Sequence, residues 1–328
     1  MPTPNKKSGT SNDKERKKQV RTVKKAYRTY KKVKKWPTAI LLLIVLAVIA
    51  YVVVQNYDAI LKALGLGPET PPKTPVSGVV AVHIIDVGQG DSILIETESG
   101  YMLIDAGTPE CRKDLEKYLK DEGVSEIEYF VLTHAHDDHT GSAKMIFDEF
   151  TVKNVIYENY GYSATFTDML ESSGANLIDP SLRDTYDLGQ THFTVLSPDP
   201  IDYGTDKNDY SVVLKMEYGE TSFVFTGDAT KKVEKKILDA FSPQELDCDF
   251  LKSGHHGSKT SSGEAFITTL SPEIIAISCG LNNRYNLPSP EVLALYDEYK
   301  IPYYRTDQEG TLVFITDGTT ITLEQNGA

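Results

Sequence analysis

Apolar residues run without interruption from 39 to 54, within a stretch of 20 uncharged residues, 38–57. A helix of that length spans about 30 Å, the thickness of the hydrocarbon core of a bilayer. Trp36 and Tyr57 flank the stretch, as interfacial aromatic residues do. The pattern predicts a transmembrane helix over 37–57, with a buried core helix as the alternative. A cleaved signal peptide is a rival, but the apolar stretch is long for one.

Residues 79–328 contain short alternating or apolar segments typical of strands, mixed with amphipathic segments typical of helices. They predict an antiparallel meander over 79–86, 92–96 and 101–104, then a helix over 109–122 and a buried strand over 127–132. Further strands are expected at 152–157, 176–178, 193–196, 211–217, 221–226, 250–252, 274–278, 312–316 and 320–323, and helices near 165–172, 231–240 and 290–300. This order predicts one α/β domain with two sheets, each covered by helices.

Charge divides the chain sharply. The first 36 residues hold 14 of the 34 Lys and Arg residues but only two of the 47 acidic residues, so the remainder carries a net charge of −25. Because basic segments stay on the cytoplasmic side, we expect 1–36 to be a cytoplasmic tail that contacts anionic lipid, and the domain to lie outside the cell membrane. A nucleic-acid-binding arm is the alternative for the tail. Residues 58–78 contain four prolines and predict an extended linker.

The strongest chemical signal is the segment from His134 to His139, which reads His-Ala-His-Asp-Asp-His directly after a predicted strand. One residue separates His134 from His136, so in extended backbone both imidazoles point the same way. Asp138 and His139 then offer a carboxylate and a third imidazole to a second centre. This combination suits zinc, manganese or iron. Three widely spaced cysteines predict neither a disulfide framework nor a thiolate metal site.

Two later segments end predicted strands with the same kinds of side chain. Residues 223–228 end in Thr-Gly-Asp, which delivers Asp228, and residues 250–258 include the pair His255 and His256. Either segment alone is a weak signal, because strand-end Asp and His are commonly turn residues. Together they bring five of the seven histidines into two strand-end clusters, beside a carboxylate able to bridge two ions.

These motifs resemble the metallo-β-lactamase superfamily, and within it the hydrolase domain of ComEC-type competence proteins. The resemblance runs through 83–92, 103–107, 133–141, 208–213, 226–228, 253–261 and 283–285. It implies an αββα sandwich that holds two divalent ions, Zn or Mn, at one edge between its sheets. One span cannot build the many-helix channel of those proteins, so a transport role is not expected here.

The resemblance also implies roles for individual residues. His134 and His136 would bind one ion, Asp138, His139 and His255 the other, and Asp228 would bridge both. In the hydrolysis that such a centre would support, Asp138 or Asp228 would orient the attacking hydroxide. His256 or a metal-bound water would then protonate the leaving group. Asp86 and Asp105 would support the site. Asn208 stands where many relatives have another histidine, and is interpreted as a weak oxygen ligand or a substrate contact. His192, in mid-strand, is expected to be an ordinary histidine.

The predicted function is hydrolysis of phosphodiesters by a membrane-anchored nuclease or phosphodiesterase. Lys252, Lys259 and Arg284 are expected to contact phosphates, and Tyr285 lies in the same resembling segment. The acidic domain opposes tight binding of duplex DNA and favours a short or single-stranded substrate. An extracytoplasmic hydrolase of lactams, lactones or phosphorylated small molecules is the alternative, and a non-enzymatic metal-binding module is the second. No protein partner is predicted.

Overall fold

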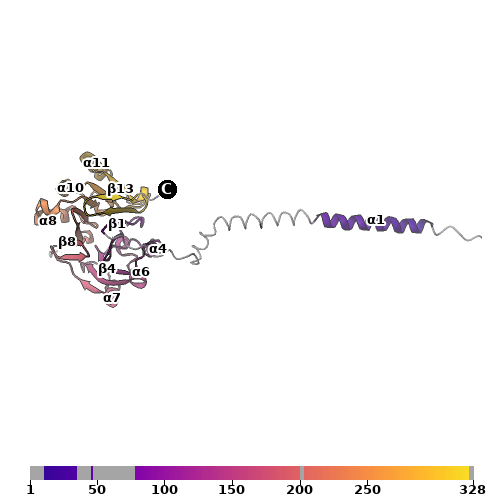
Figure 1. Ribbon diagram of the computed structural model, residues 1–328, viewed down its shortest axis with the longest axis horizontal. Helices are drawn as coiled ribbons and strands as arrows, with labels where there is room; N and C mark the ends of the chain where they lie inside the picture. The colour runs from indigo at the N-terminus through magenta and orange to yellow at the C-terminus, as the bar shows by residue number, and fades with distance from the viewer. Residues whose placement is uncertain (1–10, 35–45, 47–77, 200–202, 325–328) are drawn as a thin grey trace, which may run out of the picture. The chain divides into compact units, whose positions relative to one another are not determined.

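The computed structural model describes residues 11–34, 46, 78–199 and 203–324, and the chain divides into two units, 1–70 and 71–328. In the first unit, α1 (Ser11–Lys34) is a helix of 24 residues that is rich in Lys and Arg (Figure 1). Apart from Leu46 and Gly78, the predicted transmembrane helix and linker lie outside the described residues. Among the residues described, no helix has the length and apolar character needed to cross a membrane.

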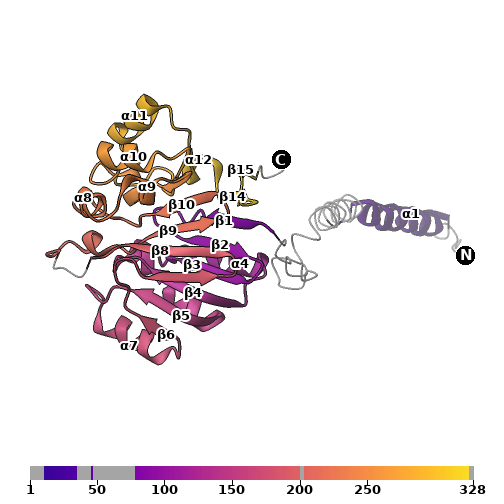
Figure 2. The same cartoon turned by 60° about the vertical axis from the view of Figure 1, so that its left-hand side comes forward.

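The second unit is built on two mixed β-sheets (Figure 2). The strand order in the first sheet is β15 (Ile321–Leu323), β14 (Leu312–Thr316), β1 (Val80–Ile84), β2 (Ile93–Thr97), β3 (Gly100–Ile104), β4 (Glu126–Leu132), β5 (Thr151–Tyr157) and β6 (Asn176–Ile178). In the second sheet it is β13 (Tyr303–Arg305), β12 (Ile274–Ile277), β11 (Phe250–Lys252), β10 (Thr221–Phe225), β9 (Val213–Tyr218), β8 (Thr191–Ser197) and β7 (Thr185–Leu188).

Helices cover the outer face of each sheet. On the first sheet these are α4 (Arg112–Asp121), α6 (Ala143–Glu149) and α7 (Ala164–Ser172), and on the second α8 (Lys231–Ala240), α9 (Pro243–Leu246), α10 (Glu264–Leu270) and α11 (Pro290–Tyr299). Short helical turns complete the domain at α5 (Asp137–Thr140), η1 (Lys207–Tyr210), η2 (Gly254–Gly257) and α12 (Thr306–Glu309). The αββα architecture predicted from the sequence is therefore confirmed.

The main core lies between the two sheets, where aromatic side chains from both meet. Phe250 of the second sheet and Phe314 of the first contact each other with ring centroids 4.8 Å apart, and both are fully buried. Burying a side chain of this size stabilises the fold by about 1.5–3 kcal/mol. Separate apolar clusters lie beneath the helices of each outer face, and the free thiols of Cys111, Cys248 and Cys279 are buried in them.

Strand direction brings the functional segments together. The strands β3 to β6 are parallel to one another, and so are β10 to β13. The carboxyl ends of parallel strands meet at one edge of their sheet. The loops after β3 and β4 therefore lie together at one edge of the first sheet. The loops after β10 and β11 likewise lie together at one edge of the second sheet.

The predicted elements match the structure best where they are long. The antiparallel meander of β1, β2 and β3 is confirmed, but the first helix begins at Arg112 rather than at 109, with Cys111 as its N-cap. The prediction missed α6 and α10 because helices of seven residues make only two turns, too few to establish a 3.6-residue period.

Candidate metal centre

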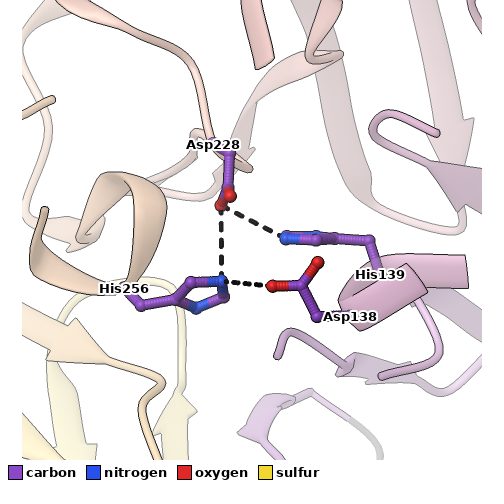
Figure 3. Close-up of side chains that lie close together, drawn as sticks. All are labelled: Asp138, His139, Asp228 and His256. Carbon is purple, nitrogen blue, oxygen red and sulfur yellow. Dashed lines mark ion pairs between the residues drawn. The ribbon is translucent and has the colours of Figure 1, made fainter. Parts of the chain in front are cut away.

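Four side chains from three loops converge at the edge shared by the sheets. Asp138 and His139 lie in α5, which follows β4, while Asp228 follows β10 and His256 follows β11. Each offers one ligand atom, and all four atoms lie within 4.8 Å of one another (Figure 3). The Oδ1 atom of Asp228 is 3.2 Å from His139 Nε2 and 3.6 Å from His256 Nε2. Such spacing suits a group of side chains that shares one ion.

The carboxylate of Asp105 holds the His139 ring in place through the ring's Nδ1 atom. Its Oδ2 atom lies 2.7 Å from His139 Nδ1, and its two carboxylate oxygens accept hydrogen bonds from the backbone N–H and the hydroxyl of Thr133. A carboxylate behind a histidine fixes the ring so that the other nitrogen faces the metal. Asp105 therefore orients His139 and is itself completely buried.

His256 is oriented in the same way by a backbone group. Its Nδ1 donates to the carbonyl of Ser278 over 3.0 Å, so Nε2 faces Asp138 and Asp228. Both His255 and His256 have left-handed backbone, with φ values of 50° and 54°. This conformation costs non-glycine residues about 1–2 kcal/mol each and is typical of functional sites. The geometry thus favours His256 as a ligand, whereas the sequence prediction assigned it to proton donation.

A second group combines His134, His136 and Asp228, whose ligand atoms also lie within 4.8 Å of one another. His134 Nε2 is 2.9 Å from His136 Nδ1 and 3.9 Å from Asp228 Oδ2, and His134 Nδ1 contacts the Thr133 hydroxyl. Asp228 belongs to both groups and offers a different oxygen to each. Its position suits the bridging carboxylate of a dinuclear centre.

His255 and Asn208 lie beside these groups. His255 Nε2 is 3.4 Å from Asp228 Oδ2, while its Nδ1 contacts the hydroxyl of Thr260, and the residue is partly exposed. Asn208, in η1, is buried, and its Oδ1 atom forms no hydrogen bond with any described residue. That oxygen is free to act as a ligand or to meet a substrate.

The chemistry of the donor set fits divalent metal ions. His139 Nε2, His256 Nε2 and Asp228 Oδ1 are buried and form no hydrogen bonds within the described part of the chain, although they point toward a common region. Buried polar atoms normally have partners, so three converging exceptions fit donors that face a shared cation. Nitrogen and carboxylate donors are those that zinc and manganese accept.

The charged side chains of the site shift one another's pKa values. Burial alone would raise the pKa of Asp228, but His139, His256 and His255 hold it well below its usual range. Burial would lower the pKa of His256, but the carboxylates of Asp228, Asp91 and Asp138 raise it to about 10. The carboxylates and imidazoles of the site therefore stabilise one another's charged forms.

The sequence reasoning missed the role of Asp91 and misjudged that of Lys252. Lys252 is completely buried, with its ammonium 2.8 Å from Asp91 Oδ2 and bonded to the carbonyl of Ser253. It therefore cannot contact a phosphate, which corrects the prediction. The other oxygen of Asp91 lies 3.3 Å from His256 Nδ1, so the buried ion pair supports a candidate ligand. The sequence did offer a signal for this ion pair, namely a lysine at the end of the otherwise apolar strand β11. A lysine buried in such a strand requires a buried acid as its partner.

The remaining predicted residues divide between the site and its surroundings. Arg284 and Tyr285 line a cavity of about 980 Å³ that opens on the metal groups. Lys259 is exposed and is not among the described residues that line this cavity. Asp86 is exposed in the loop after β1, where it accepts a hydrogen bond from the N–H of Gly88. His192 forms a surface pair with Asp187, as expected of an ordinary histidine.

The model of the metallo-beta-lactamase superfamily matches residues 85–280, so the chain belongs to that superfamily. More specifically, its sequence is similar to that of Competence protein ComA of Neisseria gonorrhoeae, with 27% identity over 78% of this chain and 35% of that protein. It is 34% identical over 256 residues to ComE operon protein 3 of Bacillus subtilis, an alignment that covers 71% of this chain and 32% of the relative. It is 31% identical to Recombination protein 2 of Haemophilus influenzae over 70% of this chain and 28% of that protein. The chain thus spans about a third of the length of these relatives.

Solved structures show the same fold at low sequence identity. The metallo hydrolase Igni18 from Ignicoccus hospitalis has a TM-score of 0.51 at 16% identity, over 72% of this chain and 98% of its own. The metallo-beta-lactamase fold protein YhfI from Bacillus subtilis has a TM-score of 0.50 at 12% identity, over 73% and 99%. At such identities the likeness concerns the fold alone.

Proposed function

We propose that this chain is a membrane-anchored, metal-dependent phosphodiesterase that acts on short or single-stranded nucleic acid. The observation that carries the proposal is the shared cavity, into which His136, Asp138 and His255 open together with Arg284 and Tyr285. A reacting phosphodiester at the metal groups would thus lie within the same cavity as a guanidinium and an exposed aromatic ring. The similarity to proteins named for recombination and for competence supports the same substrate class.

Rigid backbone presents the two substrate-side residues. Asn283 donates from Nδ2 to the carbonyls of Gly280 and Leu287, and its Oδ1 accepts from the N–H groups of Tyr285 and Leu287. The Arg284 guanidinium lies 4.7 Å from the centre of the Tyr285 ring, which is 53% exposed. An exposed ring beside a guanidinium suits stacking on a nucleobase and contact with its phosphate.

The acidic residues of the cavity limit the substrate. Glu110 and Asp137 also line it, and Arg284 is the one Lys or Arg side chain among its described lining residues. Tight binding of a long duplex depends on neutralising many phosphates, which this lining does not provide. A short segment that stacks on Tyr285 needs fewer charge contacts.

Divalent ions held by the two groups would supply Lewis acidity to the scissile phosphate and to the attacking water. Asp138 lines the cavity and is 31% exposed at its side chain, so its carboxylate is suited to orient the water. His255 is better suited than the buried His256 to move a proton at Nε2, because it is partly exposed and its other nitrogen contacts Thr260.

The first test is hydrolysis by the purified full chain with Mn²⁺ or Zn²⁺. The substrates are a single-stranded oligonucleotide, a chromogenic phosphodiester and a chromogenic cephalosporin. We expect the first two to be cleaved. Cleavage of the cephalosporin alone would favour the lactam hydrolase, and inertness toward all three would favour a non-enzymatic metal-binding module.

The residue tests use matched controls. Asp228→Ala is expected to abolish turnover with the fold retained in circular dichroism, whereas Asp187→Ala, in a surface pair, leaves it unchanged. Tyr285→Ala is expected to raise KM for the oligonucleotide by about 5- to 150-fold, since stacking contributes roughly 1–3 kcal/mol per base. It should affect the small phosphodiester much less. Tyr299→Ala, an exposed tyrosine in α11, is its control. Equal effects of Tyr285→Ala on both substrates would refute the stacking role.

The membrane assignment is part of the same proposal. It rests on the apolar stretch 39–54 and on the basic residues that precede it. Protease added to intact cells should digest the large domain and spare the basic tail. Protection of the domain would overturn its position outside the membrane.

A further inference from the structure

Helix α1, in the first unit of the chain, carries a row of exposed apolar side chains. These are Val20, Val23, Tyr27 and Tyr30, each 50–67% exposed. Because an α-helix makes a turn every 3.6 residues, spacings of three and four residues place the four side chains along one side of the helix. They form a continuous strip, called the apolar stripe below.

The opposite side of α1 is basic. The helix holds 11 Lys and Arg residues against two acidic residues. At about 100° per residue, the side chains that project away from the apolar stripe, all exposed, are those of Lys17, Arg21, Lys25, Arg28 and Lys32. Lys31 lies at the border of the two sides, with its Nζ 5.4 Å from the centre of the Tyr27 ring. A lysine at such a border covers apolar surface with its methylene groups and keeps its ammonium in water.

A helix with one apolar and one basic face is suited to the surface of an anionic membrane. Such helices lie in the plane of the bilayer, at the boundary between the lipid headgroups and the acyl chains. The apolar face meets the acyl chains, while Lys and Arg meet the anionic headgroups. Residues 35–38 alone separate α1 from the apolar stretch 39–54, which we propose crosses the membrane. The helix therefore ends within reach of a bilayer surface.

Other partners match only one of the two faces. A nucleic acid would neutralise the basic face but would leave the apolar stripe in water. A second copy of α1 could cover the stripe, whose spacing fits positions a and d of a heptad. However, the stripe extends over two heptads only, and pairing would set the basic flanks of two helices against each other. An anionic bilayer matches both faces at once.

We propose that α1 lies in the plane of an anionic lipid surface, with the apolar stripe inserted among the acyl chains and the basic face against the headgroups. Tyr27 and Tyr30 suit this depth, because a tyrosine has an apolar ring and a hydroxyl that stays hydrated. The inference rests on the membrane assignment proposed above and extends it. A basic tail held by charge alone would not bury the apolar stripe.

The test places a tryptophan on each face of α1 in the full chain. Trp36 is the one native tryptophan, so Tyr27→Trp, on the apolar stripe, and Lys25→Trp, the matched control on the basic face, are each combined with Trp36→Phe. The proteins are reconstituted into vesicles with brominated acyl chains, made of phosphatidylcholine alone or of equal parts phosphatidylcholine and phosphatidylglycerol.

We expect the indole of Tyr27→Trp to be quenched by bromine and blue-shifted in the anionic vesicles, and less so in the neutral ones. The indole of Lys25→Trp should keep an emission close to that in water. The difference between the two lipid compositions should shrink in 1 M NaCl, where the Debye length is about 3 Å.

Equal quenching of the two variants, or no quenching of Tyr27→Trp in anionic vesicles, would overturn the proposal. If a single-stranded oligonucleotide shielded Lys25→Trp while anionic vesicles left Tyr27→Trp unchanged, the partner of α1 would be nucleic acid. A blue shift of Tyr27→Trp that appeared in detergent and rose with protein concentration would assign the stripe to a second copy and overturn the proposal as well.

The wild-type chain tests the membrane span separately. Trp36 precedes the apolar stretch 39–54 and should be quenched in both lipid compositions if that stretch crosses the bilayer. Absence of this quenching, together with quenching of Tyr27→Trp in anionic vesicles, would refute the span and leave the surface helix standing.

Discussion

Replacement of Lys252 by methionine tests the buried ion pair that supports the metal centre. Lys252 and Asp91 are 0% and 1% exposed, and their charged atoms lie 2.8 Å apart. Methionine nearly matches the volume of lysine but removes the ammonium, so Asp91 is left as a buried carboxylate beside His256. Breaking a buried pair in this way costs about 3–5 kcal/mol. For a domain of this size, that corresponds to a fall in Tm of roughly 6–20 °C.

The assay is urea unfolding of the full chain, followed by circular dichroism in the presence of a chelator. Chelation removes the contribution of bound ions to the free energy of unfolding. Lys144→Met provides the control, because Lys144 pairs with Asp148 on the surface of α6 and its loss should cost less than about 1 kcal/mol.

A double-mutant cycle identifies the source of the loss. If the unpaired Asp91 carboxylate causes it, adding Asp91→Asn to Lys252→Met should recover a substantial part of the stability. Strictly additive losses in the two single variants would refute the reasoning. They would mean that Lys252 stabilises the fold through packing of its methylene chain and not through its charge.

Three further predictions follow from individual contacts. Asp105→Asn disturbs the bond to His139 Nδ1 and should weaken metal binding by about 10–100-fold in a chelator competition, with the fold intact. Burial raises the pKa of Glu234 to about 7, above its unfolded value near 4.3, so the folded state retains a proton that the unfolded state releases. The free energy of unfolding should therefore fall by up to about 3 kcal/mol as pH rises from 4.5 to 7. In Glu234→Gln this pH dependence should disappear. If it persisted in the variant, another titrating group would be its source. In Gly90→Ala the new Cβ would lie 2.3 Å from the Asp138 carbonyl oxygen. We expect the free energy of unfolding, measured in urea, to fall by roughly 1–3 kcal/mol. Unchanged stability would mean that the α5 backbone can move away from the added Cβ without cost.

The metal centre was predictable from sequence as far as its chemistry is local. His134, His136, Asp138 and His139 lie within six residues at the end of a strand, where chain geometry alone restricts their directions. Asp228 and the His255–His256 pair each end an apolar strand, and parallel strands bring such ends to a common edge. The αββα sandwich followed from the order of strands and helices and from the resemblance these motifs carry.

The choice between neighbouring side chains was not predictable in the same way. Strand periodicity does not predict which histidine of the pair faces the other donor side chains, because both adopt left-handed backbone in a helical turn. Only His256 is oriented by a hydrogen bond to the Ser278 carbonyl. Lys252 looked like a phosphate contact because its partner, Asp91, lies 161 residues earlier in the chain.

The sequence by itself determined the class of fold, the edge at which the chemistry gathers and most of the donor set, since these depend on apolar periodicity and on short spacings along the backbone. Only the tertiary structure decided which nitrogen of each ring faces the other donors, and how Asp105, Asp91 and Ser278 orient the ligands. Those relations depend on burial and on contacts between segments that the fold alone brings together, and no local pattern encodes them.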